Sequence, residues 1–285
     1  MKHTKITYTP NGPVVEGIGG PFRTTRLMWR ELVSARELVW RLFLRDFSAK
    51  YRQSALGVVW AVIMPLVTIG MFVAMNRSGI FIIGDVGVPY PLYAIIGITV
   101  WNLFSVGLVA STNALVGADV MVVKINFPKV ALILAATGQS LVEFLIRMVL
   151  VGFAFIWYGI TPSLDGLVIC LICFVPLYLL MTGIGFVMSL VAGVVRDIAN
   201  LVNIVLLALM LVTPILYPLK GASLLASANV WNPFNYLVNV PRDFLISGHT
   251  EYFNEFVSAS FLSAAVFYAG WRLFYLAQTK IAERI

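Results

Sequence analysis

The side chains of this sequence that could do chemistry include two opposite charges inside a long apolar segment. Glu143 and Arg147 lie four residues apart, so a helix places them on one face. Charges at membrane depth are costly and normally pair inside a helix bundle. A structural ion pair that fixes the rotation of the helix and a proton relay through Glu143 both fit this spacing. A proton relay would need a chain of further ionisable residues beyond these two, and none continues from them. The structural ion pair is therefore favoured.

A second chemical spacing is the C-x-x-C pair of Cys170 and Cys173, which is typical of redox and zinc sites. Both lie in an apolar run without a second Cys pair or a nearby His, which favours ordinary small apolar side chains. His3 and His249 fall near the N-terminus and in a predicted external loop. We therefore expect no metal site and no catalytic residue in this chain.

Composition places these residues in a membrane. The chain of 285 residues is 60% apolar and 12% charged, with a mean hydropathy of +0.91, outside the range of soluble domains. A crossing helix needs about 20 apolar residues, so the chain has room for several crossings and little for a separate soluble domain. We expect an all-α integral membrane protein with six transmembrane helices.

The N-terminal part divides into two predicted segments. Residues 1–26 are rich in Gly and Pro and have no apolar run long enough for a signal peptide, which predicts a flexible cytoplasmic tail. Residues 27–53 are an amphipathic helix and its connector, with Arg residues on the polar stripe, as suits the membrane interface. Packing of this helix on another protein domain is the alternative, and the two are compatible. The polar stripe holds Arg30, Ser34, Glu37, Arg41, Arg45 and Ser48, and the opposite face holds Leu32, Ala35, Val39, Leu42, Phe43 and Phe47.

Charge-free runs define a transmembrane domain over residues 54–276. The predicted spans cover about 54–76, 92–112, 130–158, 167–191, 198–216 and 256–276. Pro214 and Pro218 break the fifth span, and the apolar segment in the external region 217–250 is too short to cross, which predicts re-entrant or interfacial helices. An irregular surface loop is the alternative for that region. Residues 277–285 form the C-terminus.

Orientation follows from the basic residues. Sixteen of the twenty Lys and Arg residues fall on the side of the N-terminus, whereas Arg77, Lys220 and Arg242 fall on the other side. Cytoplasmic loops carry the excess of Lys and Arg. Both termini are therefore predicted to be cytoplasmic.

Five motifs carry a resemblance to a known family. They are RDFSAKYRQSALGVVWAVIMP (45–65), KINFP (124–128), VVRDIANLV (194–202), TPILYP (213–218) and NPFNYLVNVPRDFLISG (232–248). In this order, from about Leu38 to the C-terminus, the sequence resembles the ABC-2 type permease subunit of polysaccharide exporters, which carry lipid-linked O-antigen for lipopolysaccharide, capsular polysaccharide or teichoic acid. The resemblance implies a multi-pass protein of the bacterial cytoplasmic (inner) membrane.

The resemblance also implies a permease homodimer that carries two copies of a separate nucleotide-binding ATPase. The sequence has no G-x-x-x-x-G-K-[ST] phosphate loop, so we expect no cofactor in this chain, and ATP and Mg in the partner ATPase. Simple positive-inside anchoring remains the alternative for each ATPase-contacting residue. The residues that the family pattern assigns to ATPase coupling are Arg41, Arg45, Asp46, Asp119, Lys124, Arg196 and Asp197.

Family members export a polymer on a polyprenyl pyrophosphate carrier, which needs a wide conduit that a dimer could form at its two-fold axis. Aromatic rings would let sugar rings slide, although Trp and Tyr also gather at interfaces and Phe on lipid faces. Asparagines of the fifth span could wet a pore or bond between helices. The candidates for the channel lining are Trp60, Phe72, Trp101, Phe104, Asn200, Asn203 and Tyr217.

A lipid pyrophosphate would enter from the cytoplasmic leaflet, where cations beside a mobile turn could hold its phosphates. Lys50, Tyr51 and Arg52 lie at that depth, and Gly57 could be the hinge between the interfacial helix and the first span. We expect Lys50 and Arg52 to contact the headgroup. The partners expected are thus a second copy, two ATPase subunits, the lipid-linked polysaccharide and membrane lipids, with no nucleic acid.

Two other classes of protein remain as alternatives. An ion- or proton-coupled secondary transporter of a small solute would use Glu143 as its coupling carboxylate, but the sequence lacks visible internal repeats. A membrane-embedded acyl- or glycosyltransferase would need a cluster of His or Asp at the interface, and the sequence has none. Co-purification of a protein with a phosphate loop would distinguish the exporter from the carrier.

Overall fold

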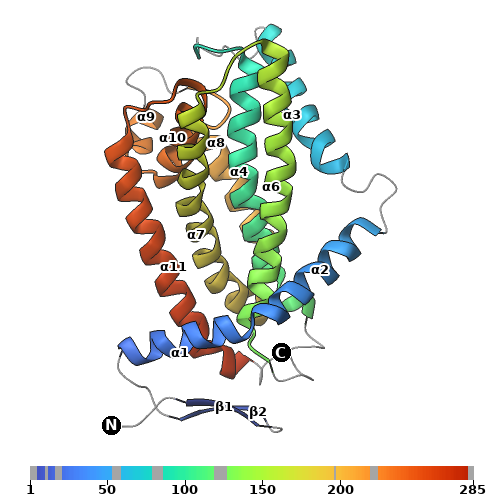
Figure 1. Cartoon of the computed structure of the whole chain (residues 1–285), viewed down its shortest axis with the longest axis vertical. Helices are drawn as coiled ribbons and strands as arrows, with labels where there is room; N and C mark the ends of the chain where they lie inside the picture. Colours follow the sequence, from blue (N-terminus) through green and yellow to red (C-terminus); the bar gives the residue numbers. More distant parts are fainter. Residues whose placement is uncertain are drawn as a thin grey trace.

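The computed structural model of the chain describes residues 5–9, 12–16, 21–52, 59–78, 86–118, 127–195, 197–218 and 224–281. Figure 1 shows an elongated bundle of long helices. Helices α1 and α2, a small hairpin and the C-terminal end of the chain lie at one end of the bundle. Helices α9 and α10 lie at the other end. We call these the α2 end and the α10 end.

Four of the described helices are long and apolar enough to cross a membrane. They are α4 (Tyr90–Asn113), α6 (Val130–Tyr158), α7 (Leu164–Val194) and α11 (Phe253–Ile281). Helices α3 (Trp60–Arg77) and α8 (Ile198–Val212) are apolar but shorter. Each of the six predicted spans thus coincides with a helix, and four of them meet the length and composition of a crossing.

Helix α4 is the centre of the bundle, because it contacts α3, α6, α7, α8 and α10. Its most extensive contacts are with α6 and α7, and α7 also contacts the short 3-10 turn η2 (Val116–Ala118). Helices α7 and α11 approach each other closely at Gly183 and Gly270, where an added Cβ on Gly183 would lie 2.5 Å from the Cα of Phe267. Small residues at crossings let helix backbones pack tightly within a membrane.

The N-terminal region differs from the prediction of a flexible tail over residues 1–26. Strands β1 (Lys5–Thr9) and β2 (Gly12–Glu16) pair antiparallel, with Lys5 opposite Glu16. Both strands are rich in residues with high β propensity, including Ile6 and Val15, whereas the prediction relied on the flanking Gly and Pro residues. The hairpin also departs from the predicted all-α fold class. The other regular elements among the described residues are helices.

Two helices replace the single amphipathic helix predicted within residues 27–53. Helix α1 (Pro21–Ser34) begins with a proline at its first position, which suits a helix start, and α2 (Arg36–Arg52) follows after a turn at Ala35. The predicted amphipathic pattern is confirmed, since the polar stripe is exposed and Ala35 and Leu42 are buried. Their apolar face packs in a cluster with residues of α6 and α11.

Helices α9 (Leu224–Asn229) and α10 (Pro233–Ser247) lie within the predicted external region 217–250. The Asn232 side chain accepts a hydrogen bond from the Phe234 backbone N–H and caps α10. Gly248 ends the helix with a positive φ of 75°, a conformation that glycine adopts most easily. Helix α10 packs on α7, α11 and α4, so this region is folded against the bundle.

Candidate functional site

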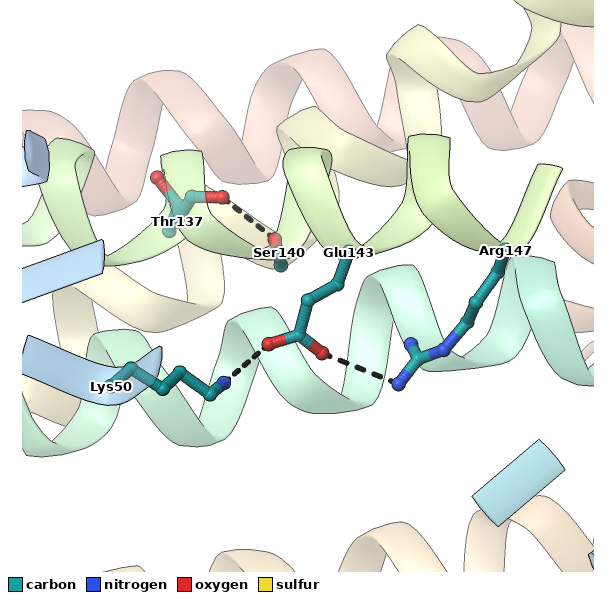
Figure 2. Close-up of polar contacts among 5 residues, drawn as sticks. All are labelled: Lys50, Thr137, Ser140, Glu143 and Arg147. Carbon is teal, nitrogen blue, oxygen red and sulfur yellow. Dashed lines mark hydrogen bonds and ion pairs between the residues drawn. The ribbon is translucent and has the colours of Figure 1, made fainter. Parts of the chain in front are cut away.

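Helix α2 is joined to helix α6 by a chain of three charges, which Figure 2 shows. The Lys50 Nζ donates a hydrogen bond to Oε1 of Glu143, and the Arg147 Nη2 donates to Oε2 of the same carboxylate over 3.3 Å. The Glu143 side chain is 7% exposed and the Lys50 side chain 47% exposed. One buried carboxylate is thus shared by a buried cation of its own helix and a half-exposed cation of α2.

The two ion pairs of Glu143 differ in strength. Breaking a buried ion pair by removing one partner costs about 3–5 kcal/mol, because a buried charge then lacks its counter-charge. An ion pair that reaches water contributes only about 0–1 kcal/mol. Breaking the Glu143–Arg147 pair therefore costs more free energy than breaking the Lys50–Glu143 contact. Lys50 is thus the cation that can exchange Glu143 for a competing anion.

Two nearby polar residues of α6 have other partners. Ser140 Oγ donates to the Thr137 backbone oxygen over 2.7 Å, and the Thr137 hydroxyl lies 3.1 Å from the Tyr178 hydroxyl of α7. Figure 2 draws the Ser140–Thr137 contact separate from the Glu143 carboxylate. The Thr137–Tyr178 contact joins α6 to α7. Neither contact extends the ionic chain, which favours the structural ion pair over a proton relay through Glu143.

A second polar link lies at the same end of the bundle. Lys129, at the start of α6, is buried and donates through Nζ to the backbone oxygen of Gln278 on α11 over 3.2 Å. Burial lowers the pKa of the Lys129 ammonium. The Gln278 side chain in turn donates to Glu31 of α1 over 3.4 Å. Helices α1, α6 and α11 are therefore tied together where α2 meets the bundle.

The exposed face of α2 carries the charges predicted to contact an ATPase. Arg41 pairs with Glu37 over 2.6 Å and Arg45 pairs with Asp46 over 2.6 Å. Surface pairs of this kind contribute little to stability, so both arginines can exchange their partners for those of another protein at little cost.

Of the other residues predicted to couple to the ATPase, the structure describes only Asp197. Asp119, Lys124 and Arg196 lie outside the described residues. Asp197 is exposed at the N-terminus of α8, and its side chain makes no capping hydrogen bond there. The structure therefore brings Arg41, Arg45 and Asp46 together on one helix.

The predicted headgroup residues occupy the end of α2. Lys50 is in contact with Glu143, which the sequence did not predict because the two residues are 93 positions apart. Tyr51 and Arg52 belong to α2, but their side chains and Gly57 lie outside the described residues. Charge balance gave no signal for this contact, because Arg147 already neutralises Glu143 on the same helix.

The candidate channel residues separate into buried and exposed groups. Trp101 and Phe104 of α4 are buried and pack on Phe234 of α10, with 4.6 Å between the ring centroids of Phe104 and Phe234. Neither ring lies on a surface that a polymer could touch in this conformation, because α10 folds over them. Both rings are buried in the single chain, and their role as channel-lining residues stays a prediction.

The remaining candidates lie nearer the surface of the chain. Trp60 is exposed and Phe72 half-buried on α3, and Asn200 and Asn203 are exposed on α8. The Tyr217 hydroxyl donates to the Leu211 backbone oxygen at the end of α8. Elsewhere, Cys170 and Cys173 are buried in α7 as free thiols.

The sequence matches the family described as ABC-2 type transporter over residues 37–245. The chain therefore belongs to the ABC-2 type transporter family and is a multi-pass membrane protein, and its family implies pairing with an ATPase subunit. The O-antigen export system permease protein RfbA of Myxococcus xanthus is 24% identical over 195 residues, which cover 67% of this chain and 72% of that protein. A protein of the same name from Klebsiella pneumoniae is 24% identical over 229 residues, covering 78% of this chain and 84% of that protein.

Proposed function

We propose that this chain is the membrane subunit of an ATP-driven exporter that moves a lipid-linked polysaccharide from the cytoplasmic side across the inner membrane. Two copies form the conduit, and two copies of a separate ATPase bind ATP and Mg on the cytoplasmic face. The relatives named as O-antigen export permeases support an O-antigen-like substrate.

The attachment of α2 to α6 is the observation that carries this proposal. The exposed arginines of α2 face away from the bundle, and the opposite face is fixed to α6 through Leu42 and the Lys50–Glu143 contact. An ATPase that binds the exposed face would therefore transmit its movement directly to a membrane helix. A secondary transporter would have no need of such an exposed charged helix at the end of the bundle.

The proposed topology places the α2 end in the cytoplasm, as the positive-inside rule requires. Helices α3 and α8 complete the six crossings, and the α10 end faces outward with α9 and α10 as re-entrant or interfacial helices. Much of the apolar surface of α3 and α8 is exposed in the single chain, including Met64 and Val67 of α3 and Ile204 and Leu207 of α8. Lipid or a second copy would cover these faces, and in this proposal the second copy covers part of them.

The lipid pyrophosphate is proposed to bind at the end of α2. Lys50 is half-exposed and shares Glu143 with Arg147, so a phosphate oxygen could replace Glu143 as the partner of Lys50 while Arg147 keeps the carboxylate neutralised. Arg52 follows on the same helix.

The test begins with purification of the tagged full-length chain from its own cells. We expect an ATPase subunit with a phosphate loop to co-purify, ATP hydrolysis that depends on Mg, and cytoplasmic accumulation of a lipid-linked glycan when the chain is depleted. Reversal of charge at both Arg41 and Arg45 to Glu should weaken the co-purification, whereas Arg77→Glu, an exposed arginine at the end of α3, is the matched control. Solute uptake that collapses with the proton gradient and needs no ATPase would instead establish the secondary transporter.

A further inference from the structure

A cavity of about 410 Å³, lined by both polar and apolar residues, lies beside α10, at the end of the bundle away from α2. It opens between α10, the segment after α8 and the start of α4. Its volume is within the range of small-molecule sites. The polar and aromatic residues that line it are Tyr93, Asn229, Asn235, Tyr236, Asn239, Arg242, Asp243 and Tyr252.

Arg242 is the fixed donor of this cavity. Its side chain is 3% exposed, its Nη1 donates to the Ile215 backbone oxygen over 3.1 Å, and its guanidinium lies 3.6 Å from the centre of the Tyr93 ring. Among the described residues, none forms a hydrogen bond with Nε of Arg242. Buried polar groups almost always have a partner, so the held guanidinium has a donor left for a ligand.

The amide and carboxylate groups beside Arg242 can exchange hydrogen bonds with hydroxyls. The Asn239 amide donates to Oδ1 of Asn235 over 2.6 Å, and the Asp243 carboxylate accepts from the Thr250 hydroxyl over 3.1 Å. Asn239 Oδ1 also accepts from Nη2 of Arg242, and the Asn235 amide donates to the Asn229 backbone oxygen over 3.4 Å. Each amide has two donor hydrogens and an oxygen with two lone pairs, so each keeps one donor and one acceptor position for a ligand. Because Arg242 and Asp243 carry opposite charges, the site suits neutral, hydroxyl-rich groups better than a bare anion.

Aromatic rings continue from this cavity into a second one. The Tyr236 and Tyr252 rings lie 6.0 Å apart between centroids. A neighbouring cavity of about 240 Å³ shares Val230 and Tyr236 with the first one and is also lined by Trp231 and Glu255. The Trp231 side chain is 87% exposed, which leaves its ring face open to a ligand.

We propose that these two cavities bind two consecutive sugar units of a glycan, the first between the Asn and Asp side chains and Arg242, and the second on Trp231. Hydroxyls find donors and acceptors in the first cavity, and the apolar face of a pyranose ring packs on an aromatic face in the second. This inference rests on the proposed function, because in that topology the α10 end is where the polymer leaves the membrane.

The binding experiment uses the full-length permease in lipid nanodiscs, without ATPase or ATP. The probe is the delipidated oligosaccharide released by mild acid from the surface glycan of the producing cell, and dextran of equal length is the control ligand. Binding is followed by isothermal titration calorimetry and by tryptophan fluorescence. We expect the probe to bind and to change the fluorescence of the wild type.

Two variants test the two cavities separately. Asp243→Asn keeps the shape of the side chain and removes an acceptor charge, and Trp231→Ala removes the open ring. Each should weaken binding of the probe about tenfold, and Trp231→Ala should also abolish the fluorescence change. Trp157→Ala is the matched control, because Trp157 is 85% exposed and lies outside both cavities. It should bind the probe as the wild type does.

The outcomes separate this inference from the proposed function. If the complex exports glycan but both variants bind the probe as tightly as the wild type, or if dextran binds equally well, the sugar site is wrong and the exporter stands. If the probe binds and the variants weaken it, but no ATP-driven export occurs, the site stands and the exporter is wrong. Binding of inorganic phosphate in place of the probe would overturn the assignment to sugars.

Discussion

Replacement of Glu143 with glutamine tests whether one buried carboxylate holds two cations. The substitution keeps the shape of the side chain and removes the charge that neutralises Arg147, which is almost fully buried on the same helix. Breaking a buried pair from one side costs about 3–5 kcal/mol, and loss of the half-exposed Lys50 contact adds at most about 1 kcal/mol. We therefore expect a loss of about 3–5 kcal/mol that comes mainly from the Arg147 charge.

Thermal unfolding of the purified chain in detergent, followed by the loss of its monodisperse chromatographic peak, measures this effect. For a chain of this size 1 kcal/mol corresponds to a shift in Tm of about 2 °C, so Glu143→Gln should lower the Tm by about 6–10 °C. Arg41→Gln is the control, because it removes an exposed ion pair and should shift the Tm by less than about 2 °C.

A double variant makes the test specific to charge. Glu143→Gln combined with Arg147→Met removes both charges, and apolar replacement of a buried pair is often neutral or stabilising. The double variant should therefore recover most of the Tm that the single variant loses. The reasoning is refuted if Glu143→Gln shifts the Tm no more than Arg41→Gln does, or if the double variant is less stable than the single one.

Three further substitutions test other parts of the structure. Lys50→Met should cost less than about 1 kcal/mol of stability but lower the stimulation of ATPase activity by the lipid-linked glycan in the reconstituted complex, and unchanged stimulation would remove Lys50 from the headgroup site. Gly183→Ala should cost about 1–3 kcal/mol because its Cβ would strike the α11 backbone, whereas Gly152→Ala, with nothing within 4 Å, should be tolerated in the same Tm assay. Phe104→Ala should cost about 3–5 kcal/mol of stability, because Phe104 is a core residue. Trp60 is exposed, so Trp60→Ala should leave the Tm within about 2 °C of the wild type. A stable Phe104→Ala variant with impaired export would favour the channel prediction instead.

The long helices could be predicted from the sequence because their signal is local. Apolar runs of sufficient length with few charges mark the four helices that can cross a membrane, and α6 begins and ends at the residues predicted for the third span. The division of α2 into a polar and an apolar face likewise follows from spacings of three and four residues. Short-range periodicity is the property that these elements share, and no tertiary contact is needed to find it.

The tertiary contacts of the site could not be predicted in the same way. Lys50 and Glu143 are 93 residues apart, and nothing in the local pattern of either residue names the other as its partner. The burial of Trp101 and Phe104 also depends on a distant element, because α10 places Phe234 on them. Aromatic type alone cannot separate a ring that lines a conduit from a ring packed under a later helix.

The unequal strength of the two contacts of Glu143 has a mechanical consequence for α2. If Lys50 leaves, Arg147 remains 3.3 Å from the carboxylate, so no buried charge is stranded and the cost stays near that of an exposed pair. The apolar residues of α2, such as Leu42, remain packed in the cluster with α6. The C-terminal end of α2 can therefore exchange its ionic partner while the rest of the helix stays attached. In the proposed exporter, a phosphate that takes Lys50 would release the C-terminal end of α2 from Glu143, on the same helix whose opposite face is proposed to bind the ATPase.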